Sequence, residues 1–374
     1  MEKIKSFLTS TIWGQSLLLL LGWNLVIRLI AIVAYYLLPS RFAPLDFIAP
    51  FFQSNFLFWS FANFDGEHYL SIAKYGYQFR GGFPQYAFFP LLPSLIKLVS
   101  FVVRDFYLAG MIVSQTALYL AIVFLRKWQS ELNLPDITRN ILLSSGAIFL
   151  ASIYTEPVFL ALASMTMFFA EKRWWGRAFL AVAFATATRV NGIFLLAFLV
   201  LKMIQSKIAY KKVFLALPIM MLGIISYMTF LYFKTGDAIA WYHAQGAWGK
   251  ATATSPLTTA ISYLKAITTE FVPDFTHLVV LLEVITTLFA IYLFIKLLEL
   301  KMLDYAYWVY LAGNLAMPIM TGSLGSMPRF FLILFPLLVV IPRLSRFERA
   351  LYYTYSLGAC LIGILFFSRG YWYG

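Results

Sequence analysis

The sequence predicts an all-α polytopic membrane protein, a single domain over residues 1–374 with about eleven transmembrane helices. Composition predicts this class: 61% of the residues are hydrophobic and 12% are charged, whereas soluble domains carry roughly 25% charged residues. Apolar runs long enough to cross a bilayer also recur along the whole chain, and no linker or low-complexity tract separates them. Since backbone polar groups must be satisfied inside the membrane, such runs form helices.

The net charge of +13 reflects membrane topology rather than nucleic-acid binding. Lys and Arg lie mostly in the short connections between apolar runs, where they mark the cytoplasmic side. The only cysteine, Cys360, excludes an internal disulfide and a cysteine metal site. No small-residue cleavage site follows the first apolar run, so we expect that run to be retained as a helix.

The first predicted span covers residues 15–38. Lys3 and Lys5 precede it and put its start in the cytoplasm. Asn24 and Arg28 are one helical turn apart, so they share a face. We expect this face to pack against protein, because a lipid-facing Arg at mid-depth is costly.

A long external segment is predicted for residues 39–106. Its last apolar run, 88–103, contains two prolines and a lysine and is short for a span, which favours an interfacial or re-entrant helix. The next span is predicted at 107–125, because Arg126 and Lys127 follow it and must stay on the cytoplasmic side.

Nine further spans complete the alternation, and each cytoplasmic turn between them is basic. The apolar stretches between residues 140 and 205 are short, so their ends need neighbouring protein or a water-filled cavity. A second external segment is predicted for residues 234–274, and the C-terminus is predicted outside. The nine spans are predicted at 137–153, 156–170, 178–188, 193–204, 213–233, 277–298, 305–320, 329–341 and 350–367.

Residues 63–93 differ from the rest of the chain because they are polar, acidic, glycine-rich and aromatic between apolar runs. Asp65 occupies the N-cap position of a helix that Gly76 ends, so one interpretation is a plain capping role. A cap needs only an oxygen acceptor, however, and Glu67 and His68 follow directly. Ionisable clusters beside membrane spans are usually functional. We therefore predict Asp65 as the catalytic residue and Glu67 and His68 as substrate-binding residues.

Other polar side chains fall in turns that the alternation places on the same external face. Each turn alone is explained as a helix end. Arg189 and Arg329 are different, because both abut apolar helices on the side where positive charge is disfavoured. They predict an anionic partner such as a phosphate. The candidate substrate-binding residues in these turns are Tyr154, Glu156, Arg189, Asn191, Lys234, Asp237, His243 and Arg329.

Several fragments, in order along most of the chain, resemble the PIG-V family of mannosyltransferases, which add the second mannose to the GPI anchor, and their prokaryotic relatives. The resemblance implies the GT-C fold, a polyprenyl-phosphate sugar donor of the dolichyl-phosphate type, and inversion at the anomeric carbon. It also implies that the acid of the family's WD-type pattern is Asp65, with Phe64 in place of the usual Trp. The expected sugar is mannose. The family's own glycolipid acceptor is not carried over to this chain, and the expected acceptor is a hydroxyl of a lipid-linked or cell-surface glycolipid or glycan. The fragments are FDGEHYLSIAKYGY, YAFFPLLP, SIYTEPVF, ATRVNGIF, YFKTGDAIAWYHAQ and SMPRFFLILFP.

The residues fit this chemistry independently. A lipid phosphate is a good leaving group that needs cations rather than a general acid. Inverting transfer to a hydroxyl needs one carboxylate base within hydrogen-bond reach. Asp65 and the external arginines supply this minimal set. Asp65 and Glu67 could also hold a divalent cation through oxygen ligands, but two residues do not define a metal site, and no cofactor is assigned.

Two other functions also suit a polytopic chain. A transporter or flippase of lipid-linked saccharides would place polar groups near mid-membrane and often contains internal repeats, whereas here the polar groups cluster at one face. A membrane acyltransferase or phosphotransferase would favour a buried catalytic histidine, but His68, His243 and His277 lie in or beside external segments. We therefore favour a multi-pass glycosyltransferase of the cell membrane, acting on lipid substrates at its extracytoplasmic face.

Overall fold

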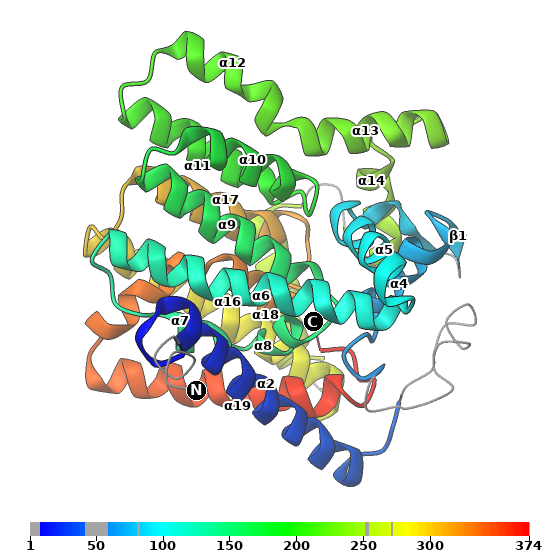
Figure 1. Cartoon of the computed structure of the whole chain (residues 1–374). Coiled ribbons are helices and arrows are strands. Elements are labelled where there is room, and N and C mark those ends of the chain that lie inside the picture. The colour runs from blue at the N-terminus through cyan, green and yellow to red at the C-terminus, as the bar shows by residue number, and fades with distance from the viewer. Residues whose placement is uncertain (1–7, 42–58, 81–82, 251–253, 271, 374) are drawn as a thin grey trace.

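The computed structural model describes residues 8–41, 59–80, 83–250, 254–270 and 272–373. Within these ranges the regular structure is helical apart from a hairpin of β1 Phe79–Arg80 and β2 Phe83–Pro84. Figure 1 shows the long helices arranged as one bundle. The predicted all-α class is confirmed. Lys3 and Lys5, and residues 42–58 of the predicted external segment, lie outside the described residues.

Four helices are long and apolar enough to cross a membrane: α2 Ile12–Leu37, α6 Phe106–Glu131, α16 Phe275–Glu299 and α19 Arg346–Phe367. A fifth candidate is a pair of helices that pass the same test together and are bent by 45°, α12 Tyr210–Met220 and α13 Leu222–Thr235. By length and composition, the described residues thus contain four or five membrane spans. The predicted number of eleven is not confirmed.

The other predicted spans are shorter or divided. Four single helices occupy predicted positions: α9 Thr155–Glu171, α10 Trp175–Thr186, α11 Gly192–Gln205 and α17 Tyr305–Met320. They have 12 to 17 residues, fewer than the roughly 20 of a full crossing. Short helices of this kind need protein around their ends.

Besides the bent pair α12 and α13, two more runs predicted as single spans are each divided in two, so they do not form continuous helices as predicted. Residues 137–153 form α7 Thr138–Leu142 and α8 Ala147–Ala151, with a turn between them. Residues 329–341 lie in α18 Met327–Ile333 and the 3-10 helix η4 Phe335–Arg343, because Pro336 cannot continue an α-helix. Every residue of α8 and α18 is buried, so both helices are enclosed by protein.

The polar face predicted on α2 packs against protein. The Asn24 side-chain nitrogen donates to the Gln115 side-chain oxygen on α6 at 2.9 Å. The Arg28 guanidinium lies 4.6 Å from the centroid of the Phe61 ring. Both contacts confirm that this face is turned towards the protein interior.

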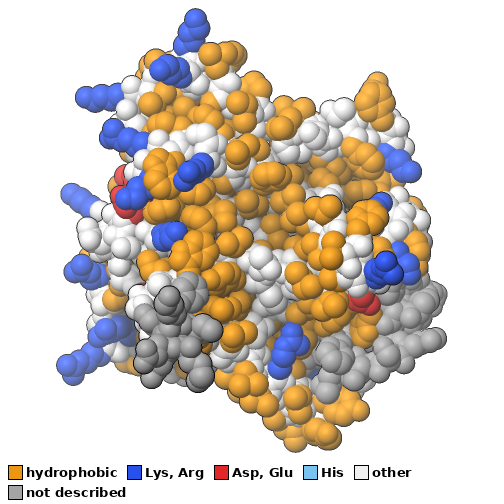
Figure 2. Space-filling view, in the orientation of Figure 1, with side chains coloured by type: hydrophobic (Ala, Val, Ile, Leu, Met, Phe, Trp, Pro, Cys, Tyr) orange, Lys and Arg blue, Asp and Glu red, His pale blue; other side chains and the backbone are white. Residues whose placement is uncertain are grey.

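Shorter elements gather at one end of the bundle. Figure 1 shows α4 Asp65–Tyr75, α5 Leu91–Val103, α14 Ala240–His243 and β1 together at the right of the view. In Figure 2, Lys and Arg side chains project along the opposite, left edge, and a broad hydrophobic region lies between the two ends. This is the distribution expected when the basic end is cytoplasmic. The thirteen residues of α5 are too few for a span, as predicted.

Candidate active site

Asp65 is the first residue of α4 and not its cap. The cap position is taken by Phe64, whose φ of 59° lies in the left-handed region, and no side chain caps the helix. The predicted N-cap position of Asp65 is therefore wrong, and its carboxylate makes other contacts. The new position still suits an acid, because a helix N-terminus stabilises negative charge by about 0.3–1 kcal/mol. Gly76 ends α4 at a φ of 77°, as predicted.

The loop before Asp65 is fixed by contacts with distant parts of the chain. The Tyr154 hydroxyl donates to the Asn63 carbonyl oxygen, and the Asn63 side-chain amide donates to the Phe367 carbonyl oxygen, both at 2.8 Å. The Phe64 ring packs against the Phe367 ring with centroids 5.7 Å apart. Such packing holds an unfavourable backbone conformation in place, and it ties the start of α4 to α9 and α19.

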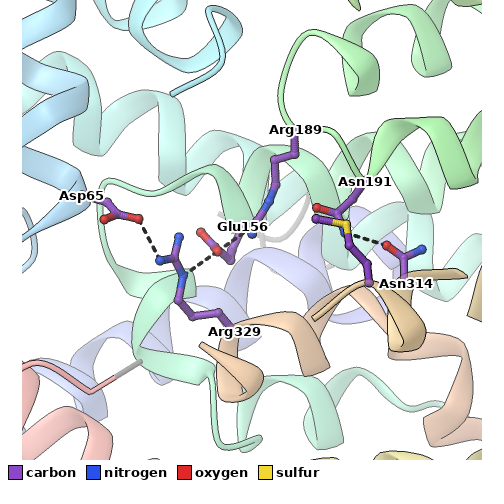
Figure 3. Close-up of polar contacts among 7 residues, drawn as sticks. Asp65, Glu156, Arg189, Asn191, Asn314 and Arg329 are labelled. Carbon is purple, nitrogen blue, oxygen red and sulfur yellow. Dashed lines mark hydrogen bonds and ion pairs between the residues drawn. The ribbon is translucent and has the colours of Figure 1, made fainter. Parts of the chain in front are cut away.

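Asp65 belongs to a chain of ion pairs, drawn in Figure 3. Arg329 Nη1 lies 2.7 Å from Asp65 Oδ2, and Arg329 Nε lies 2.9 Å from Glu156 Oε1. Arg189 Nη1 bonds the same Glu156 oxygen at 2.5 Å. Four of the predicted site residues are thus brought together from α4, the start of α9, the α10–α11 turn and α18.

The two acids of this chain differ in exposure. The Glu156 side chain is 0% exposed, whereas the Asp65 side chain keeps 14%. Burial of a carboxylate is costly unless cations surround it, and Glu156 receives two guanidinium groups. The Arg329 guanidinium also lies over the rings of Phe149 and Tyr154, 5.0 and 4.8 Å from their centroids. Glu156 therefore positions the arginines, and Asp65 is the acid that a ligand can reach.

The start of α18, which carries Arg329, is placed by close packing. A Cβ atom at Gly146 would lie 2.1 Å from the Pro328 carbonyl oxygen, so only glycine permits this approach. On the other side, the backbone N–H of Ser326 donates to Glu283 Oε1 on α16 at 3.1 Å. Ser326 has a φ of 73°, which this bond to a buried acid helps to hold. The Arg329 side chain thus leaves a rigid support.

A cavity of about 180 Å³ opens beside Asp65 and Arg329. Three cationic side chains and one carboxylate line it, so the cavity attracts an anion. Aromatic rings form most of the remaining wall. The polar side chains of the wall belong to Asp65, Tyr69, Thr155, Thr188, Arg189, Asn191, Gln245, Trp248, Lys250, Ser326 and Arg329, and the larger apolar ones to Phe88, Phe89, Met317, Phe330 and Trp372.

Glu67, His68 and Tyr154, predicted to bind substrate, do not line this cavity. All three are buried. The His68 ring stacks on Phe88 with centroids 4.8 Å apart, and burial lowers the His68 pKa to about 4. His68 is therefore neutral at physiological pH and supports the cavity wall as a flat aromatic surface. Substrate binding by these three residues stays a prediction.

Three further predicted residues lie at the α13–α14 end of the second external segment. Lys234 lines a separate groove of about 500 Å³ together with Lys97. Asp237 Oδ2 pairs with His243 Nδ1 at 2.7 Å on the surface, and this contact lowers the Asp237 pKa. None of the three lines the cavity beside Asp65, and their role in substrate binding also stays a prediction. Asn191 does line it, and its side chain donates to Asn314 Oδ1 at 2.8 Å.

Sequence reasoning missed two charged residues of the site. Lys250 lines the cavity, but a lysine in a polar external segment carries no particular signal. Glu283 holds the backbone of Ser326, and its signal was present in the sequence, because it is an acid inside the apolar helix α16.

The arrangement suits transfer chemistry at an anionic leaving group. A partly exposed carboxylate can accept a proton, and fixed cations stabilise negative charge that develops on a departing phosphate. In the part of the chain that the structure describes, no group of three or more His, Cys, Asp or Glu side chains could hold a metal ion. A divalent cation between Asp65 and Glu67 stays a prediction.

Comparison with known proteins adds two findings. The profile of the family described as Mannosyltransferase (PIG-V) matches residues 4–242. The human protein GPI alpha-1,6-mannosyltransferase 2 is 28% identical over 178 residues, which cover 43% of this chain and 35% of the human protein. The match thus spans about a third of that relative's length. No solved structure gives a significant match.

Proposed function

Because this chain belongs to the PIG-V mannosyltransferase family, we propose that it is an inverting membrane glycosyltransferase with the GT-C fold. The proposed reaction moves a sugar, most simply mannose, from polyprenyl phosphate to a hydroxyl of a lipid-linked or cell-surface glycolipid or glycan. The observation that carries the proposal is a cavity in which one partly exposed carboxylate lies among three cations.

In the proposed reaction, Asp65 is the general base. The acceptor oxygen bonds to the anomeric carbon while the bond between that carbon and the phosphate oxygen breaks. The hydroxyl proton passes to the Asp65 carboxylate, and the electron pair of the broken bond leaves on the lipid phosphate. Attack from the side opposite the phosphate inverts the anomeric centre. Arg329, 2.7 Å from Asp65, holds the carboxylate in one orientation.

Arg189 and Arg329 are proposed to stabilise the departing phosphate. Both are anchored by Glu156, so little reorganisation is needed when charge develops. A guanidinium has five N–H donors, and each arginine uses only part of this set on Glu156 and Asp65. The remaining donors are suited to phosphate oxygens.

The lipid chain of the donor is proposed to lie in the groove of about 500 Å³ between α4, α5 and α13. Its walls are mainly apolar and include Tyr75, Tyr227 and Phe230, and Lys97 and Lys234 add positive charge. The helix α4 contributes to both the groove and the cavity. An isoprenoid chain on one side of α4 and its phosphate on the other would fit this arrangement.

We further propose eleven passes through the membrane, in which the divided runs 137–153 and 329–341 cross as broken segments enclosed by protein, with residues 39–106 and 234–274 on the extracytoplasmic face. The short helix α9, most of which is buried, would cross inside protein, whereas α10 and α11 expose part of their apolar surface. Cysteines introduced at exposed Ser130 and Thr269, in a Cys360→Ser background, should label from opposite sides of sealed vesicles. Labelling of both from the same side would contradict this topology.

The decisive experiment is a donor panel. Purified protein in lipid nanodiscs is incubated with polyprenyl-phosphate mannose, glucose or galactose and a membrane lipid extract as acceptor. We expect cleavage of the mannose donor with release of polyprenyl phosphate. A transporter or flippase of lipid-linked saccharides would instead move the donor across a vesicle membrane intact. Absence of donor cleavage with every sugar would contradict the proposed function.

A further inference from the structure

Lys250 enters the cavity from η3 Ala244–Trp248 in the second external segment. The Trp248 ring lies edge-on to the rings of His68 and Phe88, with centroids 5.2 Å away in both cases. Gly249 follows at a φ of 71°, a left-handed conformation that favours glycine. The aromatic contact and the glycine turn together bring Lys250 to the cavity wall.

The ammonium group of Lys250 forms no ion pair within the part of the chain that the structure describes. No hydrogen bond of its Nζ is found among the described residues either. Asp65 and Glu156 are engaged by arginines, and Glu283 accepts hydrogen bonds from the Ser326 N–H and the Tyr263 hydroxyl. Arg329 bonds Asp65 and Glu156, and Arg189 bonds Glu156. Among the described residues, Lys250 is therefore the cation of the cavity wall that no carboxylate contacts directly.

The aromatic contact of Lys250 with Phe330 does not replace an anion. Its Nζ lies 4.9 Å from the centroid of the Phe330 ring, and the Arg189 guanidinium carbon lies 5.4 Å from the same centroid. A cation–π contact attracts an ammonium less strongly than a nearby anion does, because the ring carries no net charge. Two cations beside one ring mark a place where an anion would lower the energy of the site.

The titration of Lys250 agrees with this geometry. Burial, followed by the nearby guanidinium groups of Arg329 and Arg189, lowers the Lys250 pKa to about 8. The carboxylates of Asp65 and Glu283 act in the opposite direction. A bound phosphate would restore the favourable field around the ammonium and raise this pKa again.

We propose that Lys250 binds the phosphate of the donor lipid directly, alongside Arg189. The inference rests on the proposed function, because it takes the donor to be a lipid phosphate. An ammonium group is a compact point charge with three donors, suited to phosphate oxygens. Lys250 thereby makes the second external segment part of the donor site, joined to α4 through Trp248.

Binding of polyprenyl phosphate without sugar, measured by isothermal titration calorimetry in nanodiscs, tests this assignment. Lys250→Met removes the charge and keeps the length of the side chain. We expect a roughly 10- to 100-fold loss of affinity, the range for a hydrogen bond to a charged group. Lys250→Arg should stay within a few-fold of wild type. The matched control is Lys265→Met, an exposed lysine of α15 Pro256–Thr268 in the same external segment, which should bind as wild type does.

Two further arms separate the sources of affinity. Polyprenol, which lacks the phosphate, should bind wild type and Lys250→Met equally. Inorganic phosphate should compete with polyprenyl phosphate in wild type more than in Lys250→Met. Wild-type affinity of Lys250→Met for polyprenyl phosphate would overturn the inference. Lys250→Gln, which also removes the charge, is measured in parallel. If Lys250→Met does not fold, the affinity of Lys250→Gln for polyprenyl phosphate decides between the same two outcomes.

The binding assay also separates this inference from the proposed function. No sugar is transferred in it. A wild-type protein that cleaves no polyprenyl-phosphate sugar, yet binds polyprenyl phosphate through Lys250, would contradict the proposed function and support the assignment of Lys250. A Lys250→Met variant that transfers mannose and binds the donor as tightly as wild type would support the proposed function and contradict the assignment of Lys250.

Discussion

Replacing Asp65 with Asn separates the proposed chemistry of the carboxylate from its structural contacts. The amide has nearly the same shape, and its oxygen can still accept a hydrogen bond from Arg329. It cannot take a proton from a hydroxyl at neutral pH. Arg329 also keeps its bond to Glu156, which it shares with Arg189, so it is not left without a carboxylate partner. We expect a folded protein that binds donor and transfers almost no sugar.

The expected loss of transfer rate and the expected loss of stability in Asp65→Asn differ enough to separate a catalytic role of Asp65 from a structural one. Loss of a general base lowers a rate by roughly 10²–10⁴, equal to about 2.7–5.5 kcal/mol of barrier. The Asp65 side chain is 14% exposed, so exchanging its charged hydrogen bond for a neutral one costs about 1 kcal/mol of unfolding free energy. The helix N-terminus loses a further 0.3–1 kcal/mol or so. The effect on the rate therefore exceeds the effect on stability.

The assay measures initial rates of transfer from radiolabelled polyprenyl-phosphate mannose, donor affinity, and the thermal unfolding midpoint of the same preparation. The matched control is Asp105→Asn. Asp105 is likewise an acid at the start of a helix, where it caps α6 and accepts the Leu108 N–H at 2.6 Å. It does not line the cavity, so its variant should keep full activity. Near wild-type turnover by Asp65→Asn would remove Asp65 from the mechanism and direct attention to Glu67.

Three further predictions follow from the ion pairs and the cavity. Changing either Arg189 or Arg329 to Gln should weaken donor affinity with much less effect on acceptor affinity, in titrations of each substrate; unchanged donor affinity in both variants would make them helix anchors. Changing Glu156 to Gln leaves Arg189 without its carboxylate partner and Arg329 with Asp65 alone, so the free energy of unfolding should fall by about 3–5 kcal/mol, seen as a lower thermal midpoint in detergent; an unchanged midpoint would contradict the central position of Glu156. The Lys250 ammonium, with a pKa of about 8, is protonated below that pH and loses its charge above it. The affinity for polyprenyl phosphate should therefore fall between about pH 7 and pH 9 in wild type and stay level in Lys250→Arg. Equal pH profiles of the two proteins would argue against titration of this lysine.

The positions of the helices follow largely from apolar runs and basic turns, and α17 occupies its predicted range of residues. The divided runs show that an apolar stretch need not form one continuous helix. Pro336 and the sequence Ser144-Ser145-Gly146 both carry turn signals inside apolar stretches. Their segments are apolar because they are buried in protein, and a buried segment does not need the length of a span.

The sequence predicted which charged residues belong to the candidate site, but not which of them form ion pairs with one another. Ionisable residues beside apolar helices identified Asp65, Glu156, Arg189 and Arg329, because burial of charge demands a reason. Which charges meet depends on tertiary packing, since Asp65 and Arg329 are 264 residues apart. Tertiary packing also explains why Lys250 was missed: its position in the cavity depends on the docking of Trp248 on α4.

The hydrogen bond from Asn63 to the Phe367 carbonyl has a consequence for biosynthesis, because its partners are 304 residues apart. Ribosomes extend a chain at about 5–20 residues per second, so Asn63 leaves the ribosome roughly 15–60 s before its acceptor does. During that interval the strained turn at Phe64 lacks both the bond and the ring that hold it. The nascent chain can insert its early helices while Asp65 is still unfixed, and the proposed catalytic geometry forms only when α19 docks.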